Sequence, residues 1–460
     1  MGRGIRVIET HLASGTKMKE MSPIGFVRDG EGSQGREDRL LNIYDDAEYQ
    51  EILGFGGAFT ESSALNLAQV SPEMRKKVLE LYFDPKQGIG YNFCRSTINS
   101  CDFSERFYSY DDEEDDFALA HFDISHDRQT ILPAIRDAAA IAKDLVLFSS
   151  PWSPPAWMKT NQKMAKGGKL RPECQNAWAE YVAKFVQAYE KEGVHIWGVT
   201  VQNEAKAMQG WESCVYTAGE ERDFVTGYLK PAFERAGLGD RKIFFWDHNK
   251  ERVVDRAKET LCSRRAQSCF DGIAVHWYSG DHFTALDIVH RLFPDQYLIA
   301  SEQCTGKGHT IEQSGERYAH DIIGDLNNWV NAWVDWNMFL NEDGGPSHWL
   351  EEQREDGKDE KTIWVGESPI VYDRAKDALD IRSSYYYMGH FCKYIRRGAK
   401  RIGYSLFDSA LEACAFRNPD GSIVCVVLNR AQRDREFALR YRQELADVLV
   451  KAHSIVTYIF

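Results

Sequence analysis

Eight short apolar runs, separated by segments of helical character, constrain the fold of this 460-residue chain more than any other feature. They span residues 52–59, 90–97, 144–150, 195–201, 242–247, 270–278, 297–302 and 329–340. Most are continuously apolar, which is typical of parallel strands buried on both faces. Eight strand–helix units are what a (β/α)8 TIM barrel contains. We therefore predict an α/β fold with a TIM barrel over residues 51–395. The eighth run also fits part of a helix.

The two ends of the chain have a different character. Residues 1–50 are polar and glycine-rich with short extended pieces, and short β patterns occur at 402–407, 413–417, 423–428 and 454–460. The cluster Asn418-Pro-Asp-Gly421 between two of these patterns is a hairpin signal. We predict that the N-terminal segment, 1–50, and the C-terminal segment, 396–460, form one small all-β domain beside the barrel.

Polar and aromatic side chains stand at the carboxyl ends of nearly all eight runs. They are Glu61, Arg95, Trp152, Asn203, Glu204, Asp247, His248, His276, Tyr278, Glu302, Trp336 and Asn337. The carboxyl ends of barrel strands meet at one face, where TIM-barrel enzymes carry their active sites. Packing alone does not account for such a set, so we predict a site at this face.

Two glutamates dominate this predicted site. Glu204 ends the fourth run and Glu302 ends the seventh. Two carboxylates on different strands are what cleavage of a glycosidic bond needs, one as proton donor and one as nucleophile or base. Either glutamate alone also fits a structural carboxylate held in a salt bridge.

Several neighbours have a candidate role in the site and a structural alternative. Asn203 can donate a hydrogen bond to a sugar hydroxyl or cap its strand. Tyr278 can hold the nucleophile ionised or bond to the backbone. Arg95 lies among apolar residues, so it must be paired. It can orient Glu302 and depress its pKa, or form an ion pair without a catalytic role. Trp152 and Trp336 can wall a sugar subsite or pack in the core.

Composition excludes several classes of partner. The formal net charge of −14 argues against nucleic acid and weakens electrostatic docking on anionic membranes. No apolar run approaches the length of a membrane-spanning helix, and the first residues lack the apolar stretch of a signal peptide, so a cytoplasmic location is expected. The twelve Trp and 21 Tyr fit aromatic sugar platforms as well as a large core.

Other candidate groups have simpler interpretations. The ten cysteines are scattered without a C-x-x-C pair, so free thiols are expected, and no His/Cys cluster has metal-ligand spacing. The acidic run 111–116 is interpreted as a solvated loop, with a metal site as the alternative. His121 and His126 are expected to be solvated. Cys304, two residues beyond Glu302, faces the site or is simply a small buried residue.

Several longer motifs resemble glycoside hydrolase family 30, in its glucosylceramidase-like branch. They are Gly54-Phe-Gly-Gly-Ala-Phe-Thr60, Ser100-Cys-Asp-Phe-Ser104, Ser150-Pro-Trp-Ser-Pro-Pro-Ala-Trp-Met-Lys-Thr-Asn161, Val275-His-Trp-Tyr278, Ala300-Ser-Glu302, Trp336-Asn337 and Asn341-Glu-Asp-Gly-Gly-Pro346. The similarity runs from about Gly54 to the C-terminus. It implies a (β/α)8 barrel with a side β-sandwich and a retaining mechanism.

The resemblance also implies roles for individual residues. Glu204 corresponds to the general acid/base and Glu302 to the nucleophile, and no metal or cofactor is required. The residues that it places around the sugar are Arg95, Asp102, Trp152, Asn203, His276, Tyr278, Trp336 and Asn341. One departure stands out, because the family usually has proline after the acid/base and this chain has Ala205. Alanine leaves φ free where proline would fix it.

The sequence therefore predicts an exo-acting, retaining β-glycosidase, and most specifically a glucosylceramidase-like β-glucosidase acting on a β-glycoside, with glucosylceramide as one candidate substrate. A β-xylosidase, a β-fucosidase and a β-1,6-glucanase are alternatives within the family. A barrel that only binds sugar is the non-enzyme alternative. We further predict that the loop 341–349 places Trp349 at the rim of the leaving-group site. Its charged continuation, 351–361, is expected to be a solvated tip that disfavours an acyl chain.

Overall fold

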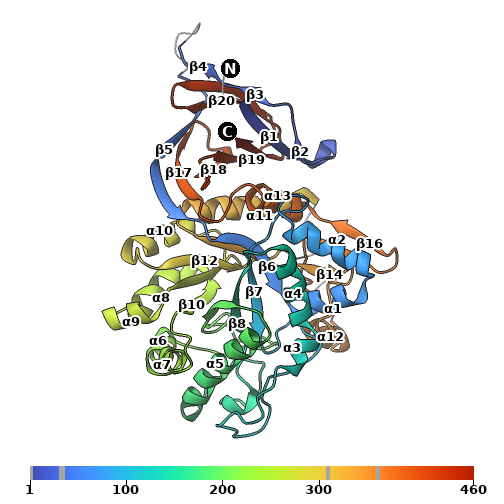
Figure 1. Ribbon diagram of the computed structural model, residues 1–460, viewed down its shortest axis with the longest axis vertical. Helices are drawn as coiled ribbons and strands as arrows, with labels where there is room; N and C mark the ends of the chain where they lie inside the picture. The colour runs from blue at the N-terminus through green and yellow to red at the C-terminus, as the bar shows by residue number, and fades with distance from the viewer. Residues whose placement is uncertain (1–3, 31–36, 307–310, 359–362) are drawn as a thin grey trace.

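The computed structural model describes residues 4–30, 37–306, 311–358 and 363–460 and contains the predicted barrel. Eight parallel strands close on themselves in chain order, with the last beside the first (Figure 1). They are β6 (Gly54–Phe59), β7 (Phe93–Ile98), β8 (Val146–Pro151), β9 (Ile196–Thr200), β10 (Lys242–Asn249), β11 (Gly272–His276), β12 (Tyr297–Glu302) and β13 (Ala332–Asn337). Each coincides with one of the eight apolar runs.

Helices connect the strands and cover the outside of the barrel. They include α1 (Glu61–Gln69), α2 (Pro72–Phe83), α3 (Ser125–Gln129), α4 (Ile131–Ile141), α5 (Gln175–Lys191), α6 (Ala218–Phe224), α7 (Lys230–Arg235), α8 (Val253–Thr260), α9 (Arg264–Cys269), α10 (Phe283–Leu292), α11 (Ile311–Asn327) and α13 (Ser383–Cys392). The Ser71 side chain caps α2 by accepting a hydrogen bond from Met74 N, as its sequence indicates.

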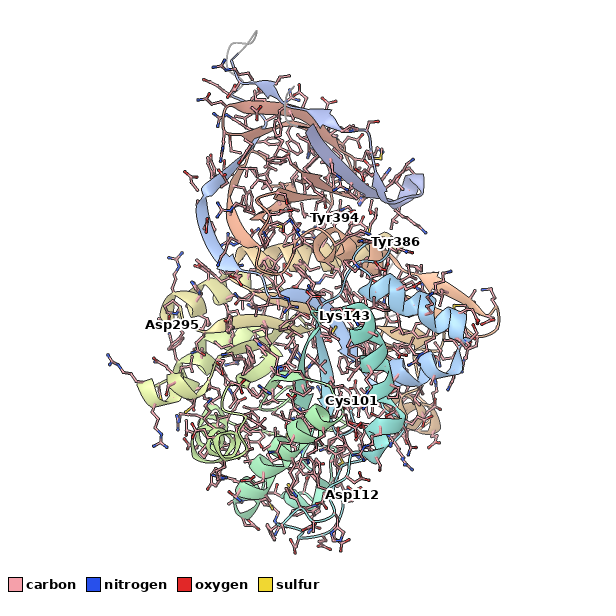
Figure 2. The ribbon with its side chains drawn as sticks, viewed as in Figure 1. Cys101, Asp112, Lys143, Asp295, Tyr386 and Tyr394 are labelled. Atoms are coloured by element: carbon pink, nitrogen blue, oxygen red, sulfur yellow. The ribbon has the colours of Figure 1, made fainter. Side chains whose placement is uncertain are left out.

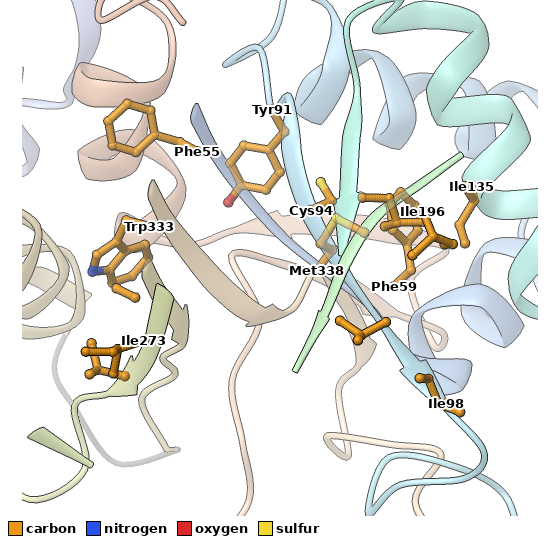
Figure 3. Close-up of a cluster of buried hydrophobic side chains, with 14 of the residues drawn as sticks. Phe55, Phe59, Tyr91, Cys94, Ile98, Ile135, Ile196, Ile273, Trp333 and Met338 are labelled. Atoms are coloured by element: carbon orange, nitrogen blue, oxygen red, sulfur yellow. The ribbon is translucent and has the colours of Figure 1, made fainter. Parts of the chain in front are cut away.

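Two apolar layers hold the barrel together. Side chains that include Phe93, Phe148 and Phe244 fill its interior. A larger cluster lies between the strands and the surrounding helices, and Figure 3 shows part of it, with Ile196 of β9 and Ile135 of α4 among the labelled residues. The strands are buried on both faces because both layers are apolar, which explains why the runs do not alternate with polar residues.

The two ends of the chain form the β-sandwich domain, at the top of Figure 1. Its strands pair in the order β2-β1-β22-β19-β18-β17-β5-β20-β21-β4. They run over Gly4–His11 (β1), Thr16–Glu20 (β2), Val27–Arg28 (β4), Leu40–Glu51 (β5), Lys400–Leu406 (β17), Leu411–Arg417 (β18), Ile423–Asn429 (β19), Arg435–Tyr441 (β20), Glu444–Val450 (β21) and Ser454–Ile459 (β22), with β3 (Ile24–Gly25) on β1. Antiparallel pairing of β1 with β22 joins the two termini.

Three parts of the fold differ from the sequence prediction. The eighth run is strand only as far as Asn337, and β14 (Phe339–Asn341) joins β15 (Ile370–Asp373) and β16 (Ala378–Ile381) in a separate small sheet. The sequence patterns did not predict strands β20 and β21, because both strands carry charged residues among the apolar ones. The charged continuation of the loop after β14 is partly helical, as α12 (His348–Glu355), and Ser347 caps it. Residues 359–361 of the predicted tip lie outside the described ranges.

The β-sandwich packs against the end of the barrel that lies away from the loops following the strands. His390 of α13 contacts Thr10 of β1 and Thr457 of β22 at 2.8 and 2.7 Å. Both Cys101 and Asp112 follow β7. In Figure 2, Asp112 lies at the bottom of the view, opposite the β-sandwich, and Cys101 lies between the two. The face that carries the strand ends is therefore open. Within the described ranges, no helix combines the length and apolarity needed to cross a membrane.

Candidate active site

The carboxyl ends of the barrel strands surround a cavity of about 260 Å³. Seven of the ten residues predicted for the site line it: Asp102, Trp152, Asn203, Glu204, Tyr278, Glu302 and Trp336. Arg95 and His276 are completely buried behind this lining. The strand ends thus bring nine of the ten residues into one layered site.

Arg95, on β7, connects the strand ends beneath the cavity floor. Its Nη1 donates to Glu302 Oε2 at 2.6 Å, and its Nη2 donates to Asp247 Oδ2 at 2.7 Å and to Asn203 Oδ1 at 2.9 Å. Its Nε donates to Ser150 Oγ at 3.0 Å. The guanidinium therefore fixes side chains from β8, β10, β12 and the end of β9. The sequence required a partner for this buried charge, and the structure supplies two carboxylates.

Glu302 ends β12 and is held by three groups. Arg95 binds Oε2, and the Tyr278 hydroxyl donates to Oε1 at 3.0 Å. His276 Nδ1 lies 3.9 Å from Oε1. Burial raises the pKa of Glu302 above its ordinary value, while His276 and Arg95 act in the opposite direction. Arg95 thus depresses this pKa as expected, but burial in the barrel outweighs it.

Glu204 follows β9 and adopts a left-handed backbone conformation, with φ of 48°. This conformation is unfavourable for a residue with a Cβ, and such strain is often found at functional positions. Hydrogen bonds fix it: Glu204 N donates to Asp247 O at 2.8 Å, and Glu204 O accepts from Ala207 N at 2.7 Å. Ala205 O also accepts from Tyr216 N at 2.7 Å. The backbone next to Ala205 is therefore held without the proline that the family usually has there.

The Glu204 carboxylate faces two imidazoles and one amide. Gln209 Nε2 donates to Oε2 at 3.2 Å. His276 Nδ1 and His248 Nδ1 lie 3.7 and 3.8 Å from Oε1. Burial raises the pKa of Glu204, but the nearby His276 imidazole and its positive charge lower it below the ordinary value. The surroundings of Glu204 therefore favour its ionised form.

His276 lies between the two glutamates and Asp247. Its Nε2 lies 3.0 Å from Asp247 Oδ1, and its buried Nδ1 has no hydrogen-bond partner among the described residues. Burial lowers its pKa, but the charge of Glu302, the bond to Asp247 and the nearby Glu204 carboxylate raise it to about 9. Asp247 stays ionised because Arg95 and His276 outweigh the effect of burial and keep its pKa far below normal. The protonated imidazole of His276 thus lies within 4 Å of three carboxylates, those of Glu204, Asp247 and Glu302.

The cavity walls combine aromatic faces with an unsatisfied carboxylate. Trp152 and Trp336 are stacked with ring centroids 5.0 Å apart, and the Arg95 guanidinium lies 4.6 Å from the Trp152 ring centroid. Asp102 Oδ1 is shielded from solvent and has no hydrogen-bond partner among the described residues. Burial, together with the charge of Glu302, raises the pKa of Asp102 well above normal. Such an oxygen gains most from a ligand hydroxyl, because a buried polar atom without a partner is costly.

Asn341 is the one predicted site residue that neither lines the cavity nor lies directly behind its lining. Its Oδ1 accepts hydrogen bonds from Asp343 N at 3.1 Å and Gly345 N at 3.0 Å. The side chain therefore shapes the turn after β14. Its contact with a sugar stays a prediction.

The sequence reading missed several cavity residues that lie on loops. Gln209, Trp211 and Trp364 line the cavity with Trp349, which the sequence had placed at the rim. Each missed residue stands in a segment without periodicity, so its position depends on how the loop folds back over the strand ends. A tryptophan in a loop that follows a barrel strand was the available signal.

Three other predictions need correction. His126 is not solvated: its Nε2 contacts Glu61 Oε1 at 2.7 Å, and its ring packs on Tyr108. Glu61 is buried in this ion pair and does not line the cavity, although it follows a barrel strand. Asp111 is also buried, unlike the rest of its acidic run.

The described residues contain one group with the spacing of metal ligands: Asp111, Asp116 and His121. Asp116 and His121 already pair with each other at 2.9 Å. None of the three lines the cavity. All ten cysteines are free, as predicted. Cys304 is buried with its Sγ 3.4 Å from the Tyr278 hydroxyl, and burial keeps its pKa well above normal, so the thiol is unreactive.

Comparisons with known proteins cover both domains. Family profiles described as "Glycosyl hydrolase family 30 TIM-barrel domain" and "Glycosyl hydrolase family 30 beta sandwich domain" match residues 52–395 and 398–458. The Mus musculus protein named lysosomal acid glucosylceramidase is 36% identical over 420 residues, covering 86% of this chain and 78% of that protein. The Neurospora crassa endo-1,6-beta-D-glucanase is 27% identical over 449 residues, covering 94% and 90%. The crystal structure of SrfJ from Salmonella typhimurium superimposes with a TM-score of 0.93 at 32% identity, covering 100% and 99%.

The ion pairs and hydrogen bonds of Arg95 lead us to a prediction about the stability of the protein. Replacing Arg95 by methionine leaves Asp247 buried without its main counter-ion, so we expect the free energy of unfolding to fall by about 3–5 kcal/mol. Urea denaturation measures this loss. Arg75→Met, which breaks an ion pair with the half-exposed Asp137, is the control and should cost less than about 1 kcal/mol. A loss for Arg95→Met as small as that of the control would contradict the network.

The raised pKa of His276 leads us to a prediction about how the stability of the protein depends on pH. Because the folded-state pKa of about 9 lies above the ordinary value, this stabilisation is complete below pH ~6.5 and is lost as pH rises through 9. We expect the wild type to lose up to about 3 kcal/mol more than His276→Gln between pH 6.5 and 10. Denaturation curves of both proteins across this range measure the difference. Parallel curves would show that His276 is neutral.

Proposed function

Because the chain belongs to glycosyl hydrolase family 30, we propose that this glycoside hydrolase is a retaining, exo-acting β-glucosidase. It removes a terminal β-linked glucose by double displacement. One observation carries the proposal: Glu204 and Glu302 line the same cavity and share one imidazole nitrogen within 4 Å. This shared contact excludes the widest separations of an inverting pair, which reach about 9.5 Å.

Glu302 is the proposed nucleophile. Arg95 and Tyr278 each hold one of its oxygens, so the carboxylate is fixed in orientation at the cavity wall. Arg95 also compensates its negative charge. Attack on the anomeric carbon forms a covalent glycosyl-enzyme and requires little further ordering, because the side chain is held before the substrate arrives.

Glu204 is the proposed general acid and base. It must carry a proton when the leaving oxygen departs, although its surroundings lower its pKa and favour the ionised form. His276, protonated below pH ~9 and 3.7 Å away, is the nearest proton source. We propose that substrate, by excluding water from Glu204, shifts this proton from the imidazole to the carboxyl group. In the second step, Glu204 takes a proton from the attacking water.

The inner half of the cavity is the proposed glucose site. Asp102 and Asn203 offer polar groups to sugar hydroxyls, and Trp152 and Trp336 offer aromatic faces to the apolar C–H surface of the ring. The exo mode is supported by the cavity volume, which lies at the small end of ligand pockets.

The relatives support a glucoside but differ in their leaving groups. The mouse relative is named for glucosylceramide, and the Neurospora crassa relative for a β-1,6-glucan. An endo-acting β-1,6-glucanase is therefore the second candidate. β-Xylosidase and β-fucosidase remain alternatives for the glycone, and a panel of aryl β-glycosides separates them. A barrel that only binds sugar would not need both carboxylates, and this chain has both.

The nucleophile can be identified by trapping. A 2-deoxy-2-fluoroglucosyl inactivator should label Glu302, because the fluorine slows hydrolysis of the covalent intermediate. Peptide mass mapping locates the label, and Glu302→Gln should not react. A label on Glu204, or an active enzyme that is never labelled, would contradict the assignment.

The acid/base can be identified by leaving-group dependence. Glu204→Gln should lower kcat/KM for an unactivated glucoside by at least roughly a hundredfold and spare the first step with a dinitrophenyl glucoside, because only a poor leaving group needs protonation. Azide should restore part of the second step, since it needs no base. Glu251→Gln, at an exposed glutamate, is the control. Equal losses on both substrates without azide rescue would rule Glu204 out.

A further inference from the structure

Three tryptophans from separate segments form the outer half of the cavity. Trp211 follows β9, Trp349 begins α12, and Trp364 lies between α12 and β15. Trp211 and Trp349 meet edge to face with ring centroids 5.0 Å apart. Trp211 also packs on the cluster that contains Trp152 and Trp336, so the aromatic lining continues from the floor to the mouth.

Two glycines seat these rings. A Cβ on Gly210 would lie 2.2 Å from the Trp349 ring, and a Cβ on Gly306 would lie 2.5 Å from Trp364 Nε1. Neither glycine has the left-handed backbone that would itself require glycine. Both positions are therefore explained by close approach: each glycine leaves room for an indole to lie flat against the backbone. Trp364 is held this way although 51% of it is exposed.

Polar groups lie beside these rings in the cavity lining, together with the apolar Phe103 and Leu350. Gln209, His248, Asn249 and Ser347 line the same region, and His248 Nδ1 is buried without a hydrogen-bond partner among the described residues. Helix α12, which carries Trp349, presents Glu351, Arg354 and Glu355 directly beyond it. Aromatic faces alternating with hydrogen-bonding groups match a sugar ring, which has apolar C–H faces and a polar edge. A long acyl chain would instead meet polar and charged groups along its path.

We infer that Trp211, Trp349 and Trp364 form a subsite for a second sugar ring, so that the leaving group is a saccharide rather than a ceramide. The inference rests on the proposed function, because it concerns the product side of the same cleavage. The net charge of −14 also favours a saccharide over a ceramide leaving group, since it opposes approach to an anionic bilayer.

The subsite can be tested apart from hydrolysis. In the enzyme trapped with a 2-fluoroglucosyl group, an acceptor that binds the outer cavity attacks the glycosyl-enzyme and restores activity. We expect methyl β-glucoside to reactivate with saturation and faster than n-octanol at equal concentration. Trp364→Ala and Trp349→Ala should lower the second-order rate constant for methyl β-glucoside roughly tenfold each. Gly210→Ala should reproduce the Trp349→Ala loss, because the added Cβ displaces the ring.

Two controls make the outcome specific. β-Glucosyl fluoride has no ring in its leaving group, so in all three variants its kcat/KM should fall much less than the rate constant for methyl β-glucoside. Phe407→Ala removes a half-exposed aromatic of the β-sandwich and should change nothing. Reactivation that prefers n-octanol, or that ignores both tryptophan variants, would overturn the inference and favour a lipid leaving group. Failure to hydrolyse β-glucosyl fluoride would instead overturn the proposed function, and the inference with it.

Discussion

The buried guanidinium of Arg95 is the interaction on which the site depends. Four barrel strands end around it, and its donors reach Glu302, Asp247 and Asn203 at 2.6 to 2.9 Å. A charge in this position would be prohibitively costly without such partners. The bonds that offset the burial of Arg95 also fix the orientation of Glu302. Arg95 also binds Asp247, which contacts His276, and His276 lies beside Glu204. One cation thus relates two carboxylates that come from different strands.

The electrostatics of the empty site do not match the catalytic roles directly. Burial raises the pKa of Glu302, and His276 lowers that of Glu204, whereas a nucleophile and a proton donor need the reverse. His276 reconciles the two, because its Nδ1 approaches both carboxylates and can exchange a proton with either. In the proposed mechanism, the proton lies on the imidazole before the substrate binds and moves to Glu204 for catalysis. Substrate binding is therefore part of the acid's activation.

Much of the fold and of the inner site could be predicted from the sequence, for physical reasons. Continuous apolar runs mark the barrel strands, and their ends place Arg95, Glu204 and Glu302 on one face. The bridging position of His276 could not be predicted, because it depends on the irregular, left-handed backbone at Trp246 and Asp247 in β10. The positions of the loop tryptophans Trp211 and Trp364 could not be predicted either, since no periodicity fixes how a loop folds. Strands β20 and β21 were missed because their charged residues hide the alternation.

The central claim is that the two glutamates act by double displacement, and the stereochemistry of the first product tests it most directly. Proton NMR can follow the anomeric signals during the first minutes of hydrolysis of an aryl β-glucoside, before mutarotation mixes them. The account predicts that β-glucose appears first and the α-anomer grows in later. Initial release of α-glucose would show a single displacement, and Glu302 could then not be the nucleophile.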